Sequence, residues 1–546
     1  MKKSLGPLIA TVIIWFLMYY YILPPLNLQS KDFWSFIIMM VIAAVFINMW
    51  SKVKETFNAQ QGQNGQINNK EAFRPFKTQL YIIGAVIAVF VVGGITSSTI
   101  FRAGAYHRII SVEQSNFKSD ITEVNYSQIP VLDRDSAALL GEREMGNMAD
   151  MVSQYEVNNN YLTQINFRGK PVRVAPLRYG GFIKWITNRK TGIPAYMMTD
   201  MTTQDVDCVR LQDGIKISPS EYFNRNLTRY LRFNYPTYMF RSFSFELDED
   251  GVPYWICSVE THTIGLFGGI DIQGAVILNA ITGEHVYYDI KDMPTWVDAV
   301  YDASLLVQQY DYYGTLKNGF LNSIFGQRDC LQTTEGYNYI ALSDDVWVYT
   351  GITSVGQDES TVGFVLMNQR TKETNYYPIA GAKEYSAMSS AQGQVQHLGY
   401  VATFPILLNV GGEPTYFMAL KDAAGLVKMY AMVNIQKYQI VATGDTVTGC
   451  DAAYRALMIK SGITATETVY TDEEEYSGVI SEIKSVVTGG DTYYYLIMEG
   501  RAGVLFEVAV GENIGILLKS PGDSVSFRYL VSEDNSNLFT VTKILE

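Results

Sequence analysis

Ser244 to Glu260 reads SFELDEDGVPYWICSVE, and Ile406 to Asp422 reads ILLNVGGEPTYFMALKD. In each copy an apolar strand enters a glycine-containing turn, and a proline then precedes a strand that begins with an aromatic residue. Short apolar runs separated by Gly and Pro are typical of antiparallel hairpins. The two stretches therefore predict two β modules of the same design.

The repeat continues downstream of each hairpin. Ile272 to Glu284 (IQGAVILNAITGE) parallels Val433 to Asp445 (VNIQKYQIVATGD), and Val365 to Tyr377 resembles Ile277 to Tyr288. A shorter segment of the same pattern occurs at residues 192–196. Repeated units bury their faces against one another, so we expect several β modules to form one elongated body.

Three uncharged apolar runs precede the β region: Leu5 to Leu23, Phe33 to Trp50 and Leu80 to Phe101. Each is long enough to cross a bilayer as a helix. The first run lacks the small-x-small site of a cleavable signal peptide, so an uncleaved helix is favoured. The sequence predicts a three-helix transmembrane anchor over residues 1–103, with a loop at 51–79.

Basic residues set the orientation of this anchor, because Lys and Arg that flank a span are retained in the cytoplasm. Residues 1–103 hold nine Lys and Arg against three Asp and Glu, and Lys2, Lys3 and the 51–79 loop carry most of them. We therefore expect a plasma (cytoplasmic) membrane protein with a cytoplasmic N-terminus and everything after residue 102 extracytoplasmic.

The outer part is acidic, with 33 basic against 52 acidic residues after residue 103. Such a surface repels phosphate backbones and anionic headgroups, so the sequence argues against nucleic acid and against lying flat on lipid. An acidic surface of this kind is compatible with the binding of divalent cations or basic partners.

The expected fold class is α+β and membrane-anchored, with a β-rich multi-module outer region. Asp135 or Ser136 is the predicted cap of a helix that runs to Tyr155, and a Thr-x-x-Asp start at Thr295 predicts a later helix. The predicted domains are a stalk at 104–134, a helix plus first α+β module at 135–240, a β repeat module at 241–330 with helix 295–310, and second and third β repeat modules at 331–470.

Residues 219–290, and more loosely 395–460, place a helix before several strands and a Thr-Gly-acidic turn. This arrangement resembles PepSY-type extracytoplasmic modules, whose members act as binding or inhibitory domains. A helix at 221–233 belongs to the same pattern. The resemblance assigns no functional residue.

The last segment, 471–546, contains about five short strands and the turn Ser520-Pro521-Gly522-Asp523. The strand order and the turn are similar to OB-like barrels, which often bind oligonucleotides or oligosaccharides. An acidic example without a basic groove argues against nucleic acid. Residues 471–475, TDEEE, are interpreted as a solvated linker, with a cation site as the alternative.

Few residues carry a chemical signature. The four cysteines have no CxxC spacing, and disulfides and buried thiols both stay open. The four histidines have no ligand spacing, and no serine-nucleophile motif occurs. The residues concerned are Cys208, Cys257, Cys330, Cys450, His107, His262, His285 and His397.

Three further features have a structural and a functional interpretation. Asp248-Glu249-Asp250-Gly251 is interpreted as a hairpin turn rather than a calcium loop, and residues 265–274 as strands rather than a phosphate loop or a fourth span. Met145, Met148 and Met151 are interpreted as core rather than a docking stripe. No catalytic, cofactor-binding or metal-ligating residue is predicted, and no cofactor.

The leading hypothesis is a non-enzymatic cell-envelope protein that contacts the lipid bilayer through three helices and whose β modules bind or scaffold envelope proteins. A homo-oligomer is compatible with it. The alternative is an extracytoplasmic cell-wall or polysaccharide-binding protein or hydrolase that uses aromatic and acidic residues. Transport is disfavoured because the spans lack charged residues.

Overall fold

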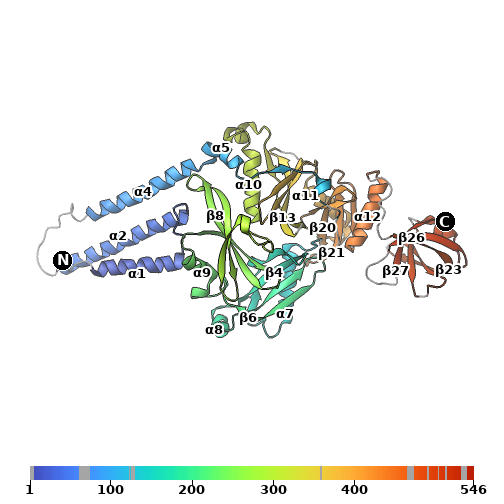
Figure 1. The fold of residues 1–546 in the computed structure, drawn as a ribbon, viewed down its shortest axis with the longest axis horizontal. Helices are drawn as coiled ribbons and strands as arrows, with labels where there is room; N and C mark the ends of the chain where they lie inside the picture. Colours follow the sequence, from blue (N-terminus) through green and yellow to red (C-terminus); the bar gives the residue numbers. More distant parts are fainter. Residues whose placement is uncertain are drawn as a thin grey trace. The chain divides into compact units, whose positions relative to one another are not determined.

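The chain forms two compact units, Met1–Ser461 and Gly462–Glu546. Figure 1 shows three long helices, several β-sheets and a C-terminal barrel. The computed structural model describes residues 5–60, 74–121, 123, 129–342, 344–356, 360–463, 473–488, 491–501, 503–510, 513–530 and 538–545.

The N-terminal region consists of helices α1 (Leu5–Ile22), α2 (Lys31–Gln60) and α4 (Arg74–Thr96). Large apolar side chains are exposed along all three, including Phe16, Phe46 and Val92. Among the residues searched, no single helix is long and apolar enough to be a membrane span. One bent pair, Tyr81–Thr96 and Thr99–His107, meets the requirement with a bend of 50°.

The predicted loop at 51–79 is wrong at both ends. Helix α2 continues to Gln60 and α4 begins at Arg74, which leaves 61–73 between them, outside the described residues. Propensity explains the difference, because the segment after Trp50 reads SKVKETFNAQ and contains neither Gly nor Pro to end a helix.

The helices are joined to the β body at one set of ends. After α1, the Leu23 carbonyl accepts a hydrogen bond from Arg232 Nε at 3.0 Å. Before α2, Gln29 Nε2 donates to the His262 carbonyl at 2.9 Å. After α4, Ser97 Oγ accepts from the Phe267 backbone N–H at 2.8 Å. All three contacts reach α9 (Leu227–Asn234) or the hairpin of β8 (Pro253–Ile264) and β9 (Gly268–Asn279).

The predicted stalk at 104–134 is wrong. Helix α5 (Thr99–His107) packs on α10 (Ala303–Thr315). Strand β1 (Glu113–Gln114) pairs in parallel with β16 (Thr374–Tyr377), and α6 (Phe117–Asp120) follows. Phe117 and Val131 are buried. The segment is therefore part of the body, since β1 pairs with β16 and these apolar side chains are covered.

Four sheets form the described body. The first holds β2 (Tyr155–Val157), β3 (Thr163–Phe167), β4 (Lys170–Tyr179), β5 (Ile193–Asp200) and β6 (Val206–Ile215). The second holds β7 (Met239–Leu247), β8 (Pro253–Ile264), β9 (Gly268–Asn279) and β10 (His285–Asp289). The third adds β11 (Leu331–Thr333), β12 (Asn338–Leu342), β13 (Asp345–Ser354), β15 (Gly363–Asn368) and β16 (Thr374–Tyr377) to β1. The fourth holds β18 (Val401–Ala402), β19 (Ile406–Val410), β20 (Glu413–Lys421), β21 (Val427–Asn434) and β22 (Val441–Gly444). A short ladder joins β14 (Ser360–Thr361) to β17 (Gly381–Ala382).

The predicted repeat is visible as one side-chain-to-backbone bonding pattern in all four of these sheets. Asn279 Oδ1 accepts from two backbone N–H groups, of Ile281 and Thr282, each at 2.9 Å. Asn368 makes the same pair of bonds in the third sheet, Asp200 in the first and Asn434 in the fourth. The short polar side chain thus builds the same turn after each strand.

The helices of the body begin at other residues than predicted. Asp133 caps α7 (Arg134–Asn147), Asn226 caps α9 (Leu227–Asn234), and Asp302 caps α10 (Ala303–Thr315). The prediction of a helix over 295–310 is wrong for its first half. The remaining helices are α8 (Phe182–Asn188), α11 (Glu384–Gln394) and α12 (Val447–Lys460).

Neighbouring sheets share cores. One cluster joins Val174 of the first sheet to Trp255 of the second, and another joins Ile277 of the second to Val348 of the third. Met145 and Met151 are buried in the first cluster and Met148 packs against it, as the core interpretation of these methionines expects.

The C-terminal unit is a closed five-stranded barrel, as the sequence predicts. Its strands are β23 (Glu473–Thr488), β24 (Asp491–Met498), β25 (Leu505–Ala509), β26 (Ser524–Leu530) and β27 (Leu538–Ile544), closed in the order β23-β24-β25-β27-β26. Leu496, Phe506 and Phe527 fill it. Strand β23 begins inside the predicted linker, whose first two residues, 471–472, lie outside the described residues.

Candidate functional site

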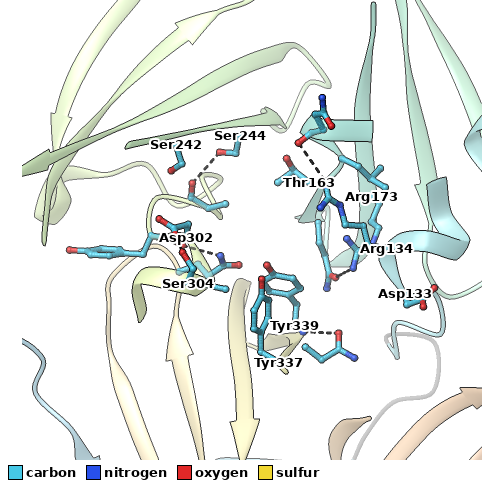
Figure 2. Close-up of a pocket in the computed structure, with 18 of the residues that line it drawn as sticks. Asp133, Arg134, Thr163, Arg173, Ser242, Ser244, Asp302, Ser304, Tyr337 and Tyr339 are labelled. Carbon is cyan, nitrogen blue, oxygen red and sulfur yellow. Dashed lines mark hydrogen bonds between the residues drawn. The ribbon is translucent and has the colours of Figure 1, made fainter. Parts of the chain in front are cut away.

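A cleft of about 510 Å³ lies where the first, second and third sheets meet. Strands β3 and β4 form one wall, β7 and the start of α10 form the opposite wall, and β12 closes the bottom. Figure 2 shows Arg134 and Arg173 on the first wall, Ser242, Ser244 and Asp302 on the second, and Tyr337 and Tyr339 below. The volume is in the range of small-ligand pockets, about 300–1,000 Å³.

Arg173 is the unusual residue of this cleft. It stands on β4 directly opposite Gln164 on β3, and its Nη2 donates to Gln164 Oε1 at 3.1 Å. Its side chain is only 3% exposed, Nε has no hydrogen-bond partner, and no carboxylate among the described residues forms an ion pair with it. Burial lowers the pKa of Arg173 to about 10.

The opposite wall is shaped by a β-bulge. The pairing of β7 with β8 shifts register between Phe240 and Phe243, so Arg241 and Ser242 share this irregularity. Arg241 bonds to Asp302, while Ser242 lines the cleft and its hydroxyl makes no hydrogen bond to any described residue. Bulges commonly redirect side chains next to functional sites.

Two of the three carboxylates that line the cleft, Asp302 and Asp133, are already engaged, and the third is Asp135. Although burial raises the pKa of Asp302, hydrogen bonds from Arg241 and Ser304 hold it below its ordinary value. Asp133 also has a pKa below its ordinary value, because bonds from Lys421 and Ser136 outweigh burial. Both residues cap helices as well, so their position is structural.

Two further carboxylates are buried beside the β7 wall. Glu246 accepts hydrogen bonds from the backbone N–H groups of Asp298 and Ala299 and from Ser244 Oγ, at 2.8, 3.0 and 2.9 Å. Asp298 accepts from the Asn166 N–H at 2.7 Å, and its Oδ1 has no partner. Burial raises the pKa of both groups, and for Asp298 the charge of Glu246 raises it further.

Aromatic side chains form the bottom of the cleft. The rings of Tyr337 and Tyr339 lie 5.7 Å apart in an edge-to-face arrangement, and Phe243 and Phe404 also line the cavity. Burial raises the pKa of the Tyr339 phenol. A buried guanidinium, the Ser242 hydroxyl and flat rings together suit a polar ligand that carries an anionic group.

The residues that the sequence singled out lie elsewhere. The four cysteines are free thiols, and Cys257, Cys330 and Cys450 are buried. Within the described ranges, no three His, Cys, Asp or Glu side chains are grouped closely enough to hold a metal ion. Asp248 Oδ1 accepts from Asp250 and Val252 N–H in the β7–β8 turn, and residues 265–274 form the β8–β9 hairpin, so both structural interpretations are confirmed.

Sequence reasoning missed Arg173. One local signal was available, because Arg173 stands between Val172 and Val174 in the run KPVRVAPL. An unpaired charge is rare and costly in a strand that is buried on both faces. Arg134, Tyr337 and Tyr339 carry no such signal.

Comparisons with known proteins identify no relative. No protein-family model matches the sequence, and no curated protein is similar to it. Among solved structures, a levansucrase variant from B. megaterium is similar over 78% of this chain and 98% of its own, at 8% identity and a TM-score of 0.17. An exo-1,5-alpha-L-arabinanase from a bovine ruminal metagenomic library is similar over 69% and 95%, at 12% identity and a TM-score of 0.15. At these TM-scores neither similarity carries an argument about fold or activity.

Proposed function

We propose that the chain is a membrane-anchored, non-enzymatic cell-envelope protein whose β modules bind other envelope proteins outside the cytoplasm. Helices α1, α2 and α4 form the anchor. Their exposed apolar side chains are costly in water, at about 25 cal/mol per Å² of apolar surface, and a bilayer removes this cost.

The contacts at the helix ends support the orientation. Leu23, Gln29 and Ser97 all contact the β body, so the end of α1, the start of α2 and the end of α4 lie on the body's side. Lys2, Lys3 and the basic residues of 51–79 belong to the other ends. Such residues stay in the cytoplasm, and this supports a body outside it.

Arg173 is the observation that carries the binding role. A buried guanidinium without a counter-ion is costly, and an anionic ligand group in the cleft offsets this cost through bidentate hydrogen bonds. On a protein partner, this group is an Asp or Glu side chain or a C-terminal carboxylate. The body's four contiguous sheets hold the cleft walls in place for such a contact.

Two of the three cleft carboxylates favour binding over hydrolysis. A general acid needs a raised pKa near the working pH, yet Asp133 and Asp302 have lowered values and are held by Lys421 and Arg241. Glu246 and Asp298 have raised values, but both are buried beside the β7 wall and accept backbone hydrogen bonds, and only Asp298 Oδ1 has no partner.

The test is capture of partners from native membranes. The tagged full-length protein is crosslinked briefly, purified in mild detergent and analysed by mass spectrometry, alongside the variants Arg173→Met and Arg178→Met. Arg178 stands on the same strand but pairs with Glu156 on the surface, at 2.8 Å, and serves as the matched control. We expect a stoichiometric partner with wild type and Arg178→Met and its loss with Arg173→Met.

Two results contradict this proposal. Equal recovery of the partner with wild type and Arg173→Met would show that binding does not depend on Arg173 in the cleft. Recovery of no partner with any variant contradicts envelope-protein binding and leaves the second candidate below.

The second candidate is a cell-wall or polysaccharide-binding protein. The flat rings of Tyr337 and Tyr339 beside hydroxyl groups favour a sugar, and Arg173 favours an acidic one. Glycan-array binding by the full chain distinguishes it from the first proposal. An OB-like barrel, supported by the parallel pairing of β25 with β27, offers a further sugar surface. The PepSY-like character of the modules stays part of the proposal.

A further inference from the structure

Helix α8 presents an apolar surface to solvent. Phe182, Ile183 and Ile186 are exposed on α8, with Ile183 at 72%, and Phe223 is exposed beside them. These four residues are named the α8 patch. The patch is rigidly held, because Trp185 beneath it is buried and donates from Nε1 to Glu221 at 2.7 Å.

Basic residues surround the α8 patch. Lys184, Arg189, Lys190 and Arg225 lie on α8, directly after it, or in the adjoining turn, and none of them forms a salt bridge with a described residue. Glu221, whose carboxylate accepts from Trp185, is buried. The net negative charge of the outer part is thus unevenly spread, and this surface is locally positive.

A second exposed apolar segment follows α10. Leu321, Ile324 and Phe325 are exposed, with Phe325 at 82%, and are named the η5 patch after the turn Asn322–Gly326. Lys317 and Arg328 flank it, and Arg328 Nε lies 3.8 Å from the Asp329 carboxylate. The end of α10 packs on α5, where the rings of Tyr312 and Tyr106 lie 4.7 Å apart.

Both patches adjoin the places where the anchor helices end. Arg229 lies over the ring of Tyr20 at 4.3 Å, and Phe233 contacts the ring of Tyr19 edge-on at 6.1 Å, which connects α9 to the end of α1. Helix α5 follows α4 directly. Figure 1 shows α5, α8 and α9 at the end of the first unit from which α1, α2 and α4 extend.

We propose that the α8 patch and the η5 patch dock on the headgroup layer of the bilayer that the anchor crosses, with the basic residues contacting anionic phospholipids. Apolar side chains within a basic surface are the usual chemistry of interfacial contact. The inference rests on the proposed anchor, because the helix-end contacts place both patches at the membrane side. It differs from the expectation that the acidic outer part avoids lipid.

The experiment uses the full chain reconstituted in vesicles of phosphatidylcholine and phosphatidylglycerol. A Cys208→Ser background leaves only buried native thiols. Single cysteines at Ile183, Phe325, Tyr438 and Phe16 each carry an environment-sensitive fluorophore. Tyr438 is the matched control, an exposed aromatic residue after β21 in the fourth sheet, and Phe16 reports on α1. Nitroxide lipids labelled at the headgroup or deep in the acyl chain act as quenchers.

We expect headgroup nitroxides to cause loss of fluorescence at Ile183 and Phe325 and not at Tyr438, and deep nitroxides to quench Phe16. The double variant Lys184→Glu/Lys190→Glu, or removal of phosphatidylglycerol, lessens the quenching at Ile183. Quenching at Phe16 without quenching at Ile183 and Phe325 overturns the docking while the anchor stands. Absence of quenching at Phe16 overturns the anchor itself. Protection of Ile183 from both lipid and aqueous quenchers overturns the inference in favour of a protein that covers the patch.

Discussion

Arg173 and Arg370 show two ways in which this fold treats a cation. Arg370 bonds to Asp345 through Nε at 2.7 Å and Nη2 at 2.8 Å, and Asn368 donates to the same carboxylate. Arg173 is more deeply buried and has only Gln164. At Arg370 the chain supplies a counter-ion. Arg173 has no ion-pair partner among the described residues, and the proposed ligand site rests on this difference.

Removing a counter-ion has the largest expected effect on stability. Asp345→Ala leaves Arg370 partly buried and unpaired, and we expect the free energy of unfolding to fall by about 2–4 kcal/mol. Urea denaturation followed by tryptophan fluorescence measures it. Glu156→Ala, which breaks an exposed pair, is the control and is expected to cost less than about 0.5 kcal/mol. Equal losses of unfolding free energy for Asp345→Ala and Glu156→Ala would contradict a larger contribution from the buried ion pair.

Replacing Arg173 is expected to act in the opposite direction. In Gln164→Leu/Arg173→Met both partners of one hydrogen bond become apolar, and an unpaired buried charge disappears. We expect the free energy of unfolding to rise by about 1–2 kcal/mol, because apolar replacement of buried charges is often stabilising. The same denaturation experiment measures it, and a loss above about 1 kcal/mol would show that Arg173 supports the fold.

The pH dependence of stability tests the buried carboxylates, which also lack a cation. Burial, then the charge of Glu246, raises the pKa of Asp298, with Asp344 and Asp345 as further acidic neighbours. Because the folded state binds this proton more tightly than the unfolded state, protonated Asp298 contributes stability below the ordinary pKa range of a carboxyl group. This contribution is lost as the pH rises through the pKa that Asp298 has in the folded protein.

Asparagine does not ionise, so the Asp298→Asn variant does not lose stability in this way as the pH rises. We expect the unfolding free energy of wild type to decline relative to the variant by up to about 1.4 kcal/mol per pH unit above the ordinary carboxyl range. Denaturation curves at a series of pH values measure the difference. Parallel pH profiles for the two proteins would mean that Asp298 ionises normally.

The smallest expected effect concerns the repeated turn. Gly283 has a φ of +82°, and Lys372 and Gln204 occupy the matching positions at +67° and +69°. Gly283→Ala introduces strain in a conformation that glycine tolerates best, with an expected cost of about 1 kcal/mol. Thermal unfolding measures it. A neutral result would indicate that the turn tolerates a side chain here as it does at Lys372.

Hairpins and the barrel could be predicted from sequence because their signals are local. Asn279 with Gly283, and Pro521 with Gly522, fix turns regardless of what packs around them. The helix at 295–310 could not, because the backbone N–H groups of Asp298 and Ala299 bond to Glu246, about fifty positions earlier in the chain. These two N–H groups donate to a carboxylate that is distant in the sequence, so this segment does not form the helix start that the local pattern predicts.

The candidate cleft was beyond sequence reasoning for a similar reason. Arg173, Ser242 and Tyr339 come from three different sheets, and no periodicity places them together. Burial of Arg173 depends on the second and third sheets covering β4. The stalk prediction was wrong on the same account, because β1 finds its pairing partner in β16, which lies far along the chain.

The bond between Arg232 and Leu23 has a consequence for biogenesis. The end of α1 is capped by a residue 209 positions downstream, which has to be synthesised before the bond forms. The Leu23 carbonyl therefore lacks this partner until α9 has left the ribosome. Completion of the end of α1 is thus coupled in time to folding of the β body, and a ribosome stalled before α9 leaves this contact unmade.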